Sequence, residues 1–431
     1  MRIPKRFPIR DLALVAAATT ITNVASYLMS LAGARLLTPQ EFGAFGALLG
    51  LSIIGSTLAI AAQTVAARRV AATDAAARDG VVSSVLRVTF AAAALLLLAS
   101  GMVSLPLARL LNVSAIAVVA TLASVAVLVV GFSVLGVIQG RSEHGRFGGA
   151  YAVLGIARAA CTIGAIVIHP SAETAAIGML VGGAFGSVLA VLVARVPLRV
   201  GPHVRGVSRE LIRNTIALLG LYTLTNLDVV LARSLLPLEQ SGYYAVGALV
   251  AKIAFFLPAF ISYVLFPRMA STRPGRARRT AVLATLVLGV AMTAASVIVA
   301  PLFIWLAGGE RYAGIESSLW LFALQGSIFA LIQAIVYVRL SSEDRGSAIL
   351  MAMGVLAFVM VVTLRMHHSV NEIVLTSILV GLAMAVVSWH AEFGSPRQRG
   401  LEHTYQWTRC EKADDPPARK TRRRCTGHST A

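Results

Sequence analysis

Charge is scarce in this sequence, and negative charge is the scarcer sign. Only 13% of its 431 residues are charged, against about 25% in an average soluble domain. Asp and Glu together number 19, half of the 38 Lys and Arg, whereas 57% of all residues are hydrophobic. A domain folded in water could not cover so much apolar surface with so few charges, so the composition excludes an ordinary soluble protein.

Cysteine is nearly absent, and recognisable catalytic or metal-binding patterns are missing. The three cysteines are Cys161, in an apolar run, and Cys410 and Cys425, in a polar tail. They form neither the even framework of a secreted disulfide domain nor a zinc spacing. His367 and His368 have no cysteine or carboxylate cluster beside them, and no Gly-rich loop follows a strand to hold a phosphate. We therefore expect no enzyme activity, no cofactor and no bound metal.

Long apolar runs recur along the whole chain. A bilayer core about 30 Å thick requires roughly 20 apolar residues in a helix. Transmembrane strands are excluded because they alternate in polarity over about ten residues, whereas these runs are continuous. The runs predict about twelve transmembrane helices. They cover 12–36, 41–67, 81–104, 114–139, 147–168, 173–194, 210–236, 240–266, 281–306, 315–338, 346–364 and 371–390.

Basic residues gather in alternate connections between these runs. The N-terminus, the loops after each even-numbered span and the tail 391–431 carry most of the Arg and Lys. Because basic loops are retained in the cytoplasm, this pattern predicts that both termini are cytoplasmic. Contacts with anionic membrane lipid then account for the net charge of +19, so no nucleic-acid partner is expected. The tail lacks apolar periodicity and is predicted to be a disordered cytoplasmic segment.

A short motif occurs twice, 198 residues apart. The first copy is Ala34-Arg35-Leu36-Leu37-Thr38-Pro39-Gln40-Glu41, and the second is Ala232-Arg233-Ser234-Leu235-Leu236-Pro237-Leu238-Glu239. The offset equals six spans, so the two halves would share one orientation about an axis along the membrane normal. We predict an all-α polytopic membrane protein with six-helix halves at 1–208 and 209–390 around a central cavity, the arrangement of an alternating-access transporter.

The first hairpin, residues 21–67, and the seventh and eighth spans, from Thr225 to Arg268, resemble the polysaccharide-flippase branch of the multidrug and oligosaccharidyl-lipid exporter superfamily. The resemblance covers roughly residues 10–390. It implies a fold like that of the multidrug and toxin extruders (MATE). It also implies transport of polyprenyl-diphosphate-linked sugar units across the cytoplasmic membrane for surface polysaccharide assembly. The machinery of that assembly would be a partner.

Polar side chains in the seventh span are the first candidates for the transport pathway, because a charge at mid-membrane costs about 2.5–3.5 kcal/mol on insertion scales. Asp228 lies nine residues before Pro237, near mid-depth. In a continuous helix Tyr222, Asn226 and Arg233 would share one face, which suits a cavity wall. Asp228 is a candidate for coupling to an ion or proton, or for a structural ion pair.

Three further side chains are candidates for contact with the transported molecule. Lys252 in the eighth span is predicted within about one turn of Asp228 in depth, so it either pairs with that carboxylate or binds the cargo. Arg158 lies near mid-depth in the fifth span, and a guanidinium can bind a diphosphate with two hydrogen bonds. Asn23 belongs to a polar set on the first helix that suits sugar binding or helix packing. Arg35 and Arg233, near the outer helix ends, are expected to snorkel.

Three functions remain open from the sequence. The first is a flippase of lipid-linked sugars in a bacterial cytoplasmic membrane. The two candidate cavity bases, Arg158 and Lys252, favour it because its cargo is anionic. The second is a cation-coupled small-molecule exporter of the same superfamily, for which cavity acids would be expected. The third is a membrane polysaccharide polymerase or ligase, which would normally need a large external loop that this chain lacks.

Overall fold

The computed structural model describes residues 9–202, 204–269, 274–340 and 346–393, and the side chains of 13–202, 204–256, 282–334 and 349–390. The predicted tail beyond residue 393 lies outside the described residues. The chain divides into two compact units, Met1–Ala385 and Val386–Ala431. The described part of the second unit is the helical segment 386–393. The first unit holds everything discussed below.

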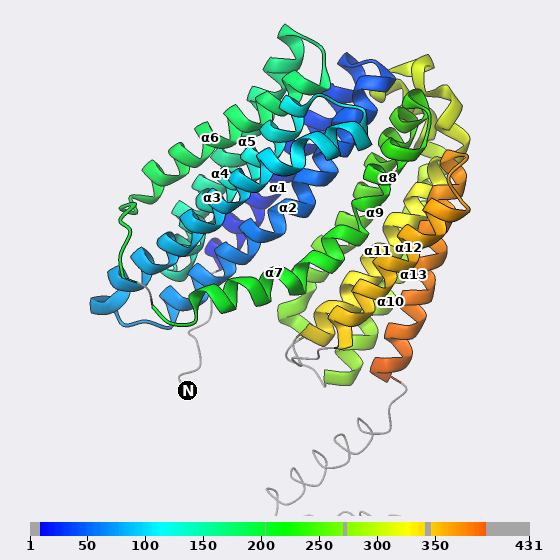
Figure 1. Cartoon of the computed structure of the whole chain (residues 1–431). Coiled ribbons are helices and arrows are strands. Elements are labelled where there is room, and N and C mark those ends of the chain that lie inside the picture. Colours follow the sequence, from blue (N-terminus) through cyan, green and yellow to red (C-terminus); the bar gives the residue numbers. More distant parts are fainter. Residues whose placement is uncertain (1–8, 203, 270–273, 341–345, 394–431) are drawn as a thin grey trace, which may run out of the picture. The chain divides into compact units, whose positions relative to one another are not determined.

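Helices account for nearly all of the described residues (Figure 1). The first six are α1 (Ile9–Leu36), α2 (Pro39–Ala71), α3 (Arg78–Leu111), α4 (Ala115–Gly140), α5 (His144–Ile168) and α6 (Ala172–Ala194), with the 3-10 helix η1 (Ala75–Ala77) before α3. Then follow α7 (Val207–Leu224), α8 (Leu227–Leu235), α9 (Leu238–Met269), α10 (Pro274–Ala307), the 3-10 helix η2 (Gly309–Ser318), α11 (Leu319–Leu340), α12 (Gly346–Leu364) and α13 (Val370–Phe393).

Each predicted apolar run coincides with one of these helices, except that the seventh is divided between α7 and α8. Within the described residues, nine helices are long and apolar enough to cross a membrane, or ten if α7 and α8 form one bent span. The apolar part of α12, Ile349–Leu364, is shorter than those nine. The structure therefore confirms a polytopic helical membrane protein, whereas the count of twelve spans is not confirmed.

The helices of the two sequence halves follow one another in the same order. The helix α6 begins at Ala172 and α13 begins at Val370, 198 residues later, which is the offset of the repeated motif. One connection differs between the halves. Three residues join α3 to α4, whereas the ten-residue η2 lies between α10 and α11.

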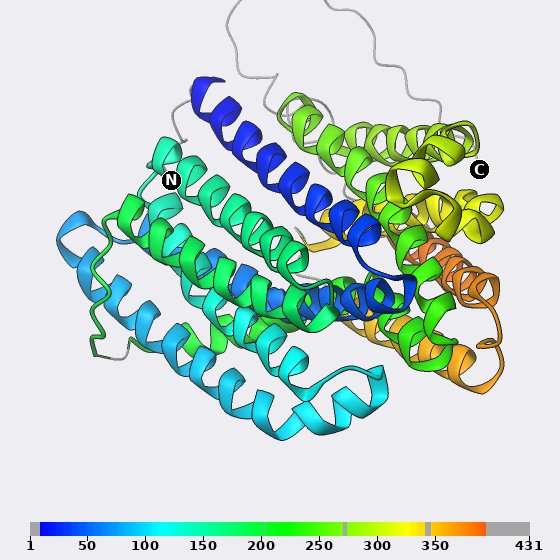
Figure 2. The ribbon, with the colours of Figure 1, turned by 90° about the horizontal axis from the view of Figure 1, so that it is seen from above.

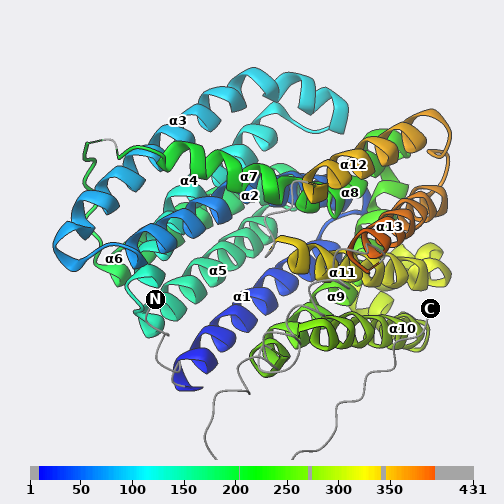
Figure 3. The ribbon, with the colours of Figure 1, turned by 90° about the horizontal axis from the view of Figure 1, so that it is seen from below.

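In the first half, α4 is the most enclosed of the apolar helices, and it packs against α2, α3 and α6. Figures 2 and 3 show α1 lying along α5, with which it makes most of its contacts. Much of α1 is nevertheless exposed: Ile21, Val24 and Leu28 are each about half accessible. In a chain that crosses a membrane such apolar side chains face lipid, so their exposure needs no protein partner.

The two halves meet mainly along α2, which contacts α7, α8 and α9. We call the end of the bundle that holds the α1–α2 and α8–α9 turns the Thr38 end, and the opposite end, with Arg68 and Arg69, the basic end. At the Thr38 end α2 and α9 cross closely. A Cβ atom added to Gly43 would meet Ser241, and one added to Gly242 would meet the carbonyl of Pro39. Since Gly43 and Ser241 are 198 residues apart, the repeated segments contact each other at equivalent positions.

Candidate functional site

The seventh span is broken near its middle, and the prediction of a continuous helix over 210–236 is wrong there. The axes of α7 and α8 differ by 51°. No proline or glycine lies at the break. The Thr225 hydroxyl donates to the carbonyl of Leu221 at 3.0 Å, and the Asn226 amide donates to that of Tyr222 at 3.0 Å. Polar side chains that bond to nearby backbone in this way favour helix ends.

A break inside a membrane span exposes backbone groups and helix ends at mid-depth, where transporters commonly place their binding sites. The helix α2 approaches this break closely. A Cβ atom added to Gly50 would lie 3.1 Å from the carbonyl oxygen of Asn226. The break is thus covered on one side by the first half of the chain. It also separates Tyr222 and Asn226 from Arg233, so these three side chains do not form the single polar stripe that a continuous helix predicted.

Asp228 lies in the first turn of α8 and is only 3% exposed. Its Oδ2 accepts hydrogen bonds from the Tyr244 hydroxyl at 3.0 Å and from Gln325 Nε2 at 2.8 Å. Gln325 Nε2 also donates to the Ser377 hydroxyl at 2.8 Å. This network joins α8, α9, α11 and α13, so the carboxylate occupies a fixed position in the second half.

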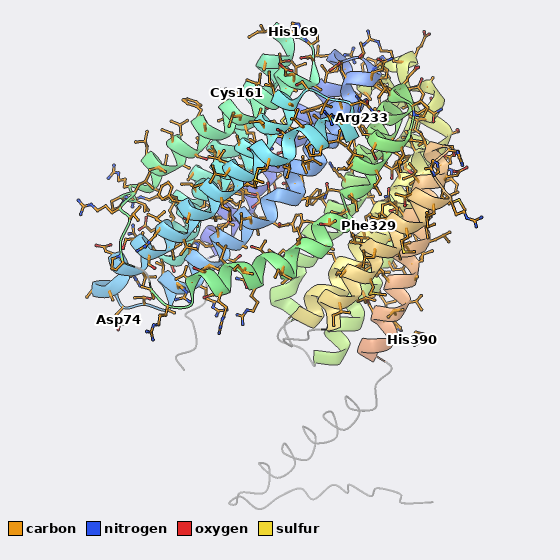
Figure 4. All side chains as sticks on the ribbon, in the orientation of Figure 1. Asp74, Cys161, His169, Arg233, Phe329 and His390 are labelled. Carbon is orange, nitrogen blue, oxygen red and sulfur yellow. The ribbon has the colours of Figure 1, made fainter. Side chains whose placement is uncertain are left out.

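A cavity opens beside this network, with a volume of about 60 Å³, and it continues into open space. Only one of its lining residues, Ile53, comes from the first half. The others come from the broken span, α9 and α11: Leu221, Tyr222, Thr225, Asn226, Asp228, Val229, Ala248, Ala251, Lys252, Phe255, Phe256, Gln325, Gly326, Phe329 and Gln333. Figure 4 shows Phe329 at mid-length of the bundle, with Arg233 nearer the Thr38 end. The cavity therefore lies near mid-length of the bundle.

Three oxygen atoms in the cavity lining are buried without a hydrogen-bond partner among the described residues. They are Asn226 Oδ1, Asp228 Oδ1 and Gln325 Oε1. Leaving a buried acceptor unsatisfied costs about 1–3 kcal/mol, so folded proteins rarely gather three of them without a use. Together they could accept hydrogen bonds from sugar hydroxyls or hold a cation.

Lys252 is the one Lys or Arg among the residues that line this cavity, and it is half-buried. Asp228 and Lys252 interact electrostatically, but these two described side chains are not joined by an ion pair within 4.0 Å. The sequence allowed a close structural ion pair between Asp228 and Lys252 as one of two alternatives, and the structure does not contain it.

Two predicted site residues lie away from this lining. Arg158 on α5 donates through Nη2 to the Ser52 hydroxyl at 2.8 Å and to Met179 Sδ at 3.5 Å, both in the first half. Its Nε is buried without a hydrogen-bond partner among the described residues. Asn23 is exposed on α1. The structure thus brings together Tyr222, Asn226, Asp228 and Lys252, and leaves Arg158 and Asn23 outside that group.

The two arginines of the repeated motif differ, although both were expected to snorkel. Arg35 is exposed and lies with its guanidinium carbon 5.8 Å from the ring centre of Trp305. Arg233 is only 4% exposed and makes four hydrogen bonds inside the protein. The expectation is therefore wrong for Arg233. Sequence reasoning also missed Tyr244, Gln325 and Ser377, whose polarity inside apolar runs was the available signal.

No family model matches the sequence, and no curated protein matches it. Solved structures do match the fold. An inward-facing multidrug resistance MATE family transporter of the MOP superfamily is 14% identical over 89% of this chain and 96% of its own, with a TM-score of 0.69. The lipid II flippase MurJ, in an inward closed conformation, is 10% identical over 94% of both chains, with a TM-score of 0.73.

A third structure provides a comparison of conformations. An outward-facing MATE family transporter, 14% identical over 91% of this chain and 96% of its own, gives a TM-score of 0.58. That value is below the 0.69 of the inward-facing structure. The chain therefore shares its fold with these MOP-superfamily transporters.

Proposed function

We propose that this protein is a transporter that moves polyprenyl-diphosphate-linked oligosaccharide units across the bacterial cytoplasmic membrane by alternating access, for surface polysaccharide assembly. Its fold is shared by a lipid II flippase and by multidrug exporters. In the proposal, the two halves rock about the cavity and both termini lie in the cytoplasm. The lipid tail stays in the bilayer, and enzymes that assemble the polysaccharide would receive the cargo.

The observation that carries the proposal is the cavity at the broken span. Lys252 offers one positive charge without a contact ion pair to Asp228, and an ammonium group is a common ligand of phosphate oxygens. Around it lie the amides of Asn226 and Gln325 and the aromatic rings of Phe255 and Phe329. The N–H groups of both amides already donate within the protein, so it is their oxygens that can accept hydrogen bonds from sugar hydroxyls. Aromatic faces can stack on the apolar faces of sugar rings.

Asp228 supplies the energy coupling in this proposal. Its Oδ1 is buried and unsatisfied, so binding of a proton or a monovalent cation would remove a desolvation cost that the empty site carries. The carboxylate also bonds to Tyr244 and Gln325, on α9 and α11. A cation bound there would therefore act directly on the packing of helices that line the cavity.

A cation-coupled small-molecule exporter is the second candidate, and the position of Arg158 favours it. With that guanidinium outside the lining, the cavity holds one acid and one base, not the two bases that the sequence suggested. The MATE structures share the same fold. A polymerase or ligase is the weakest candidate, because the solved structures named above that share this fold are transporters.

Reconstitution distinguishes these functions. Purified protein in sealed liposomes would be given three cargoes separately: a polyprenyl-diphosphate disaccharide, the same disaccharide on a neutral polyprenyl ether, and a cationic dye. Flipping is measured as protection of the sugar from an external glycosidase, and dye transport as fluorescence change under a proton or sodium gradient.

The proposal predicts that the diphosphate-linked sugar is flipped, that the neutral analogue is flipped at least about tenfold more slowly, because one charge-assisted hydrogen bond is lost, and that the dye is not moved. Dye transport without sugar flipping would establish the exporter instead. Equal flipping of the charged and neutral lipids would contradict the role of Lys252.

A further inference from the structure

Arg233 lies where the two halves of the chain meet at the Thr38 end. Its Nε donates to the carbonyl of Leu111 at 2.8 Å, and its Nη2 donates to the carbonyl of Asn112 at 3.0 Å. Its Nη1 donates to the carbonyl of Gln40 at 2.9 Å and to the Ser241 hydroxyl at 3.1 Å. Three of the four acceptors belong to the first half, so one side chain of α8 bridges both halves.

The acceptors suit a positive charge. Leu111 is the last residue of α3, and Asn112 follows it in the left-handed conformation at φ 48°. The last carbonyls of a helix have no partner within the helix and carry its negative dipole end. A guanidinium has five N–H groups in a rigid plane and can satisfy several carbonyls at once. The end of α3 and the side chain of Arg233 therefore neutralise each other.

No carboxylate forms an ion pair with Arg233 within the described part of the chain. A buried ion pair is costly to separate, because each partner is left as an uncompensated charge. Glu41 interacts electrostatically with Arg233, but these two described side chains do not form a contact ion pair. Carbonyl groups and a guanidinium near a helix end can be hydrated by water when they separate.

A second contact between the halves lies at the same end. Tyr312, in η2, is fully buried and its hydroxyl donates to the carbonyl of Ala34 at 3.2 Å. Its ring contacts those of Phe42 and Tyr243, with centroids 6.3 and 6.1 Å apart. This contact is mainly apolar, so Arg233 supplies most of the directional bonding at the closure.

We infer that Arg233 is a positioning residue that latches the Thr38 end shut, so that the cavity of Asp228 and Lys252 is closed on that side until transport opens it. The inference rests on the proposed alternating access, but not on the identity of the cargo. The repeat provides a matched control, because Arg35 occupies the equivalent position and donates one hydrogen bond, to the carbonyl of Trp305 at 3.3 Å.

The test measures access to the cavity from each side of the membrane. Cys161, Cys410 and Cys425 are replaced by Ser, and an Ala248→Cys substitution, at a buried position of the cavity lining, provides the reporter thiol. Sealed vesicles of either orientation are treated with a membrane-impermeant maleimide. A separate Glu310→Cys variant, at an exposed position of η2, identifies the vesicles whose Thr38 end faces outward. No cargo is added.

In the Arg233→Gln variant, labelling of the reporter thiol from the Thr38 side should rise about tenfold, since charge-assisted hydrogen bonds are lost. Arg35 also joins the two halves, but through a single exposed hydrogen bond to Trp305 on α10, so in Arg35→Gln the labelling should rise less than about twofold. Arg233→Lys keeps the positive charge but not the planar guanidinium, so its labelling should lie between those of the parent and of Arg233→Gln. It replaces Arg233→Gln in the test if that variant does not fold. Parent-level labelling in Arg233→Lys, or in a folded Arg233→Gln, would overturn the latch, as would an equal rise in Arg35→Gln. The measurement uses no substrate. A result against the latch would therefore leave the proposed cargo untouched, and a failure of the flipping assay would leave the latch untouched.

Discussion

The first and seventh spans begin the two repeated halves, yet they differ where the chemistry lies. The first span, α1, is one helix from Ile9 to Leu36, with Asn23 exposed on it. The seventh is broken into α7 and α8 at Thr225 and Asn226, directly before the buried Asp228. The two spans are alike at the turn that ends each of them and differ in the middle.

This difference assigns distinct roles to the halves. All but one of the cavity-lining residues belong to the second half, and Ile53 of α2 is the exception. The first half contributes the covering face of α2 and the carbonyls that hold Arg233. The two halves thus share their architecture, while the cavity chemistry is concentrated in one of them. The following predictions test that division.

Loss of the Asp228 charge should have the largest effect. Asp228→Asn preserves the shape of the side chain and its hydrogen-bonding reach but removes the carboxylate that we propose binds the coupling ion. Cargo accumulation driven by an ion gradient should fall about 100-fold, to the level of downhill exchange, because a full charge–cation interaction is lost. Uptake by proteoliposomes with and without an imposed gradient measures this. Unchanged gradient dependence would make Asp228 a packing residue.

Disrupting the contact between equivalent segments should come second. A Val side chain at Gly242 would clash with the carbonyl of Pro39 where α2 and α9 cross. Such overpacking typically costs about 1–3 kcal/mol. Thermal unfolding of Gly242→Val in detergent should show a clear loss of stability. Gly101→Val is the control, since a Cβ atom there meets nothing within 4 Å. Equal stability of the two variants would show that the crossing is not close.

At the basic end, α7 is held by the first half, although it belongs to the second by sequence. Glu210 of α7 pairs with Arg68 at 3.2 Å and with Arg69 at 2.9 Å, both on α2. The carboxylate is mostly buried and Arg69 is partly so, which makes the second pair the stronger. Glu210→Gln should cost about 1 kcal/mol, and Arg68→Ala less. Thermal unfolding of both variants shows which one loses more stability. A larger loss for Arg68→Ala would mean that the pair with Arg68, and not the pair with Arg69, is the stronger.

The smallest effect is expected on α1. Asn23→Ala should change flipping less than about twofold, because the side chain is exposed outside the cavity. Asn226→Ala is the matched change in the second half, and it removes the amide that bonds to Tyr222 and Thr225 at the break. It should slow flipping about fivefold, since one hydrogen bond is worth about 1 kcal/mol. A larger effect at Asn23 would place the cargo partly on the first half.

The positions of the spans could be predicted from the sequence because a membrane-spanning helix needs a long apolar run. Such a run can be recognised without knowing any tertiary contact. The repeated motif could also be seen in the sequence, since Ala-Arg and Pro-x-Glu recur at one offset. Polar residues inside a run were also informative, and Asp228, Lys252, Asn226 and Tyr222 do share one cavity.

What failed depends on contacts between distant segments. The break at Thr225 lacks the proline or glycine that usually marks one. The side-chain bonds to the preceding turn that accompany it also occur in unbroken helices, as at Thr121 in α4, so the sequence carried no clear signal for the break. The burial of Arg233 depends on the end of α3, about 120 residues away in the chain. The partners of Arg158 lie on α2 and α6. The position of each of these residues along its helix could be predicted, whereas the direction of its side chain could not.

The central claim, that an anionic lipid-linked cargo binds in the second-half cavity, is tested most directly by comparing two bases. Flipping of the polyprenyl-diphosphate disaccharide would be measured for Lys252→Ala and Arg158→Ala in proteoliposomes at equal protein content. Lys252→Ala should reduce the rate about 10- to 100-fold, the loss expected for one charge-assisted hydrogen bond, and Arg158→Ala should reduce it less. A larger loss at Arg158, or a normal rate in Lys252→Ala, would contradict the account.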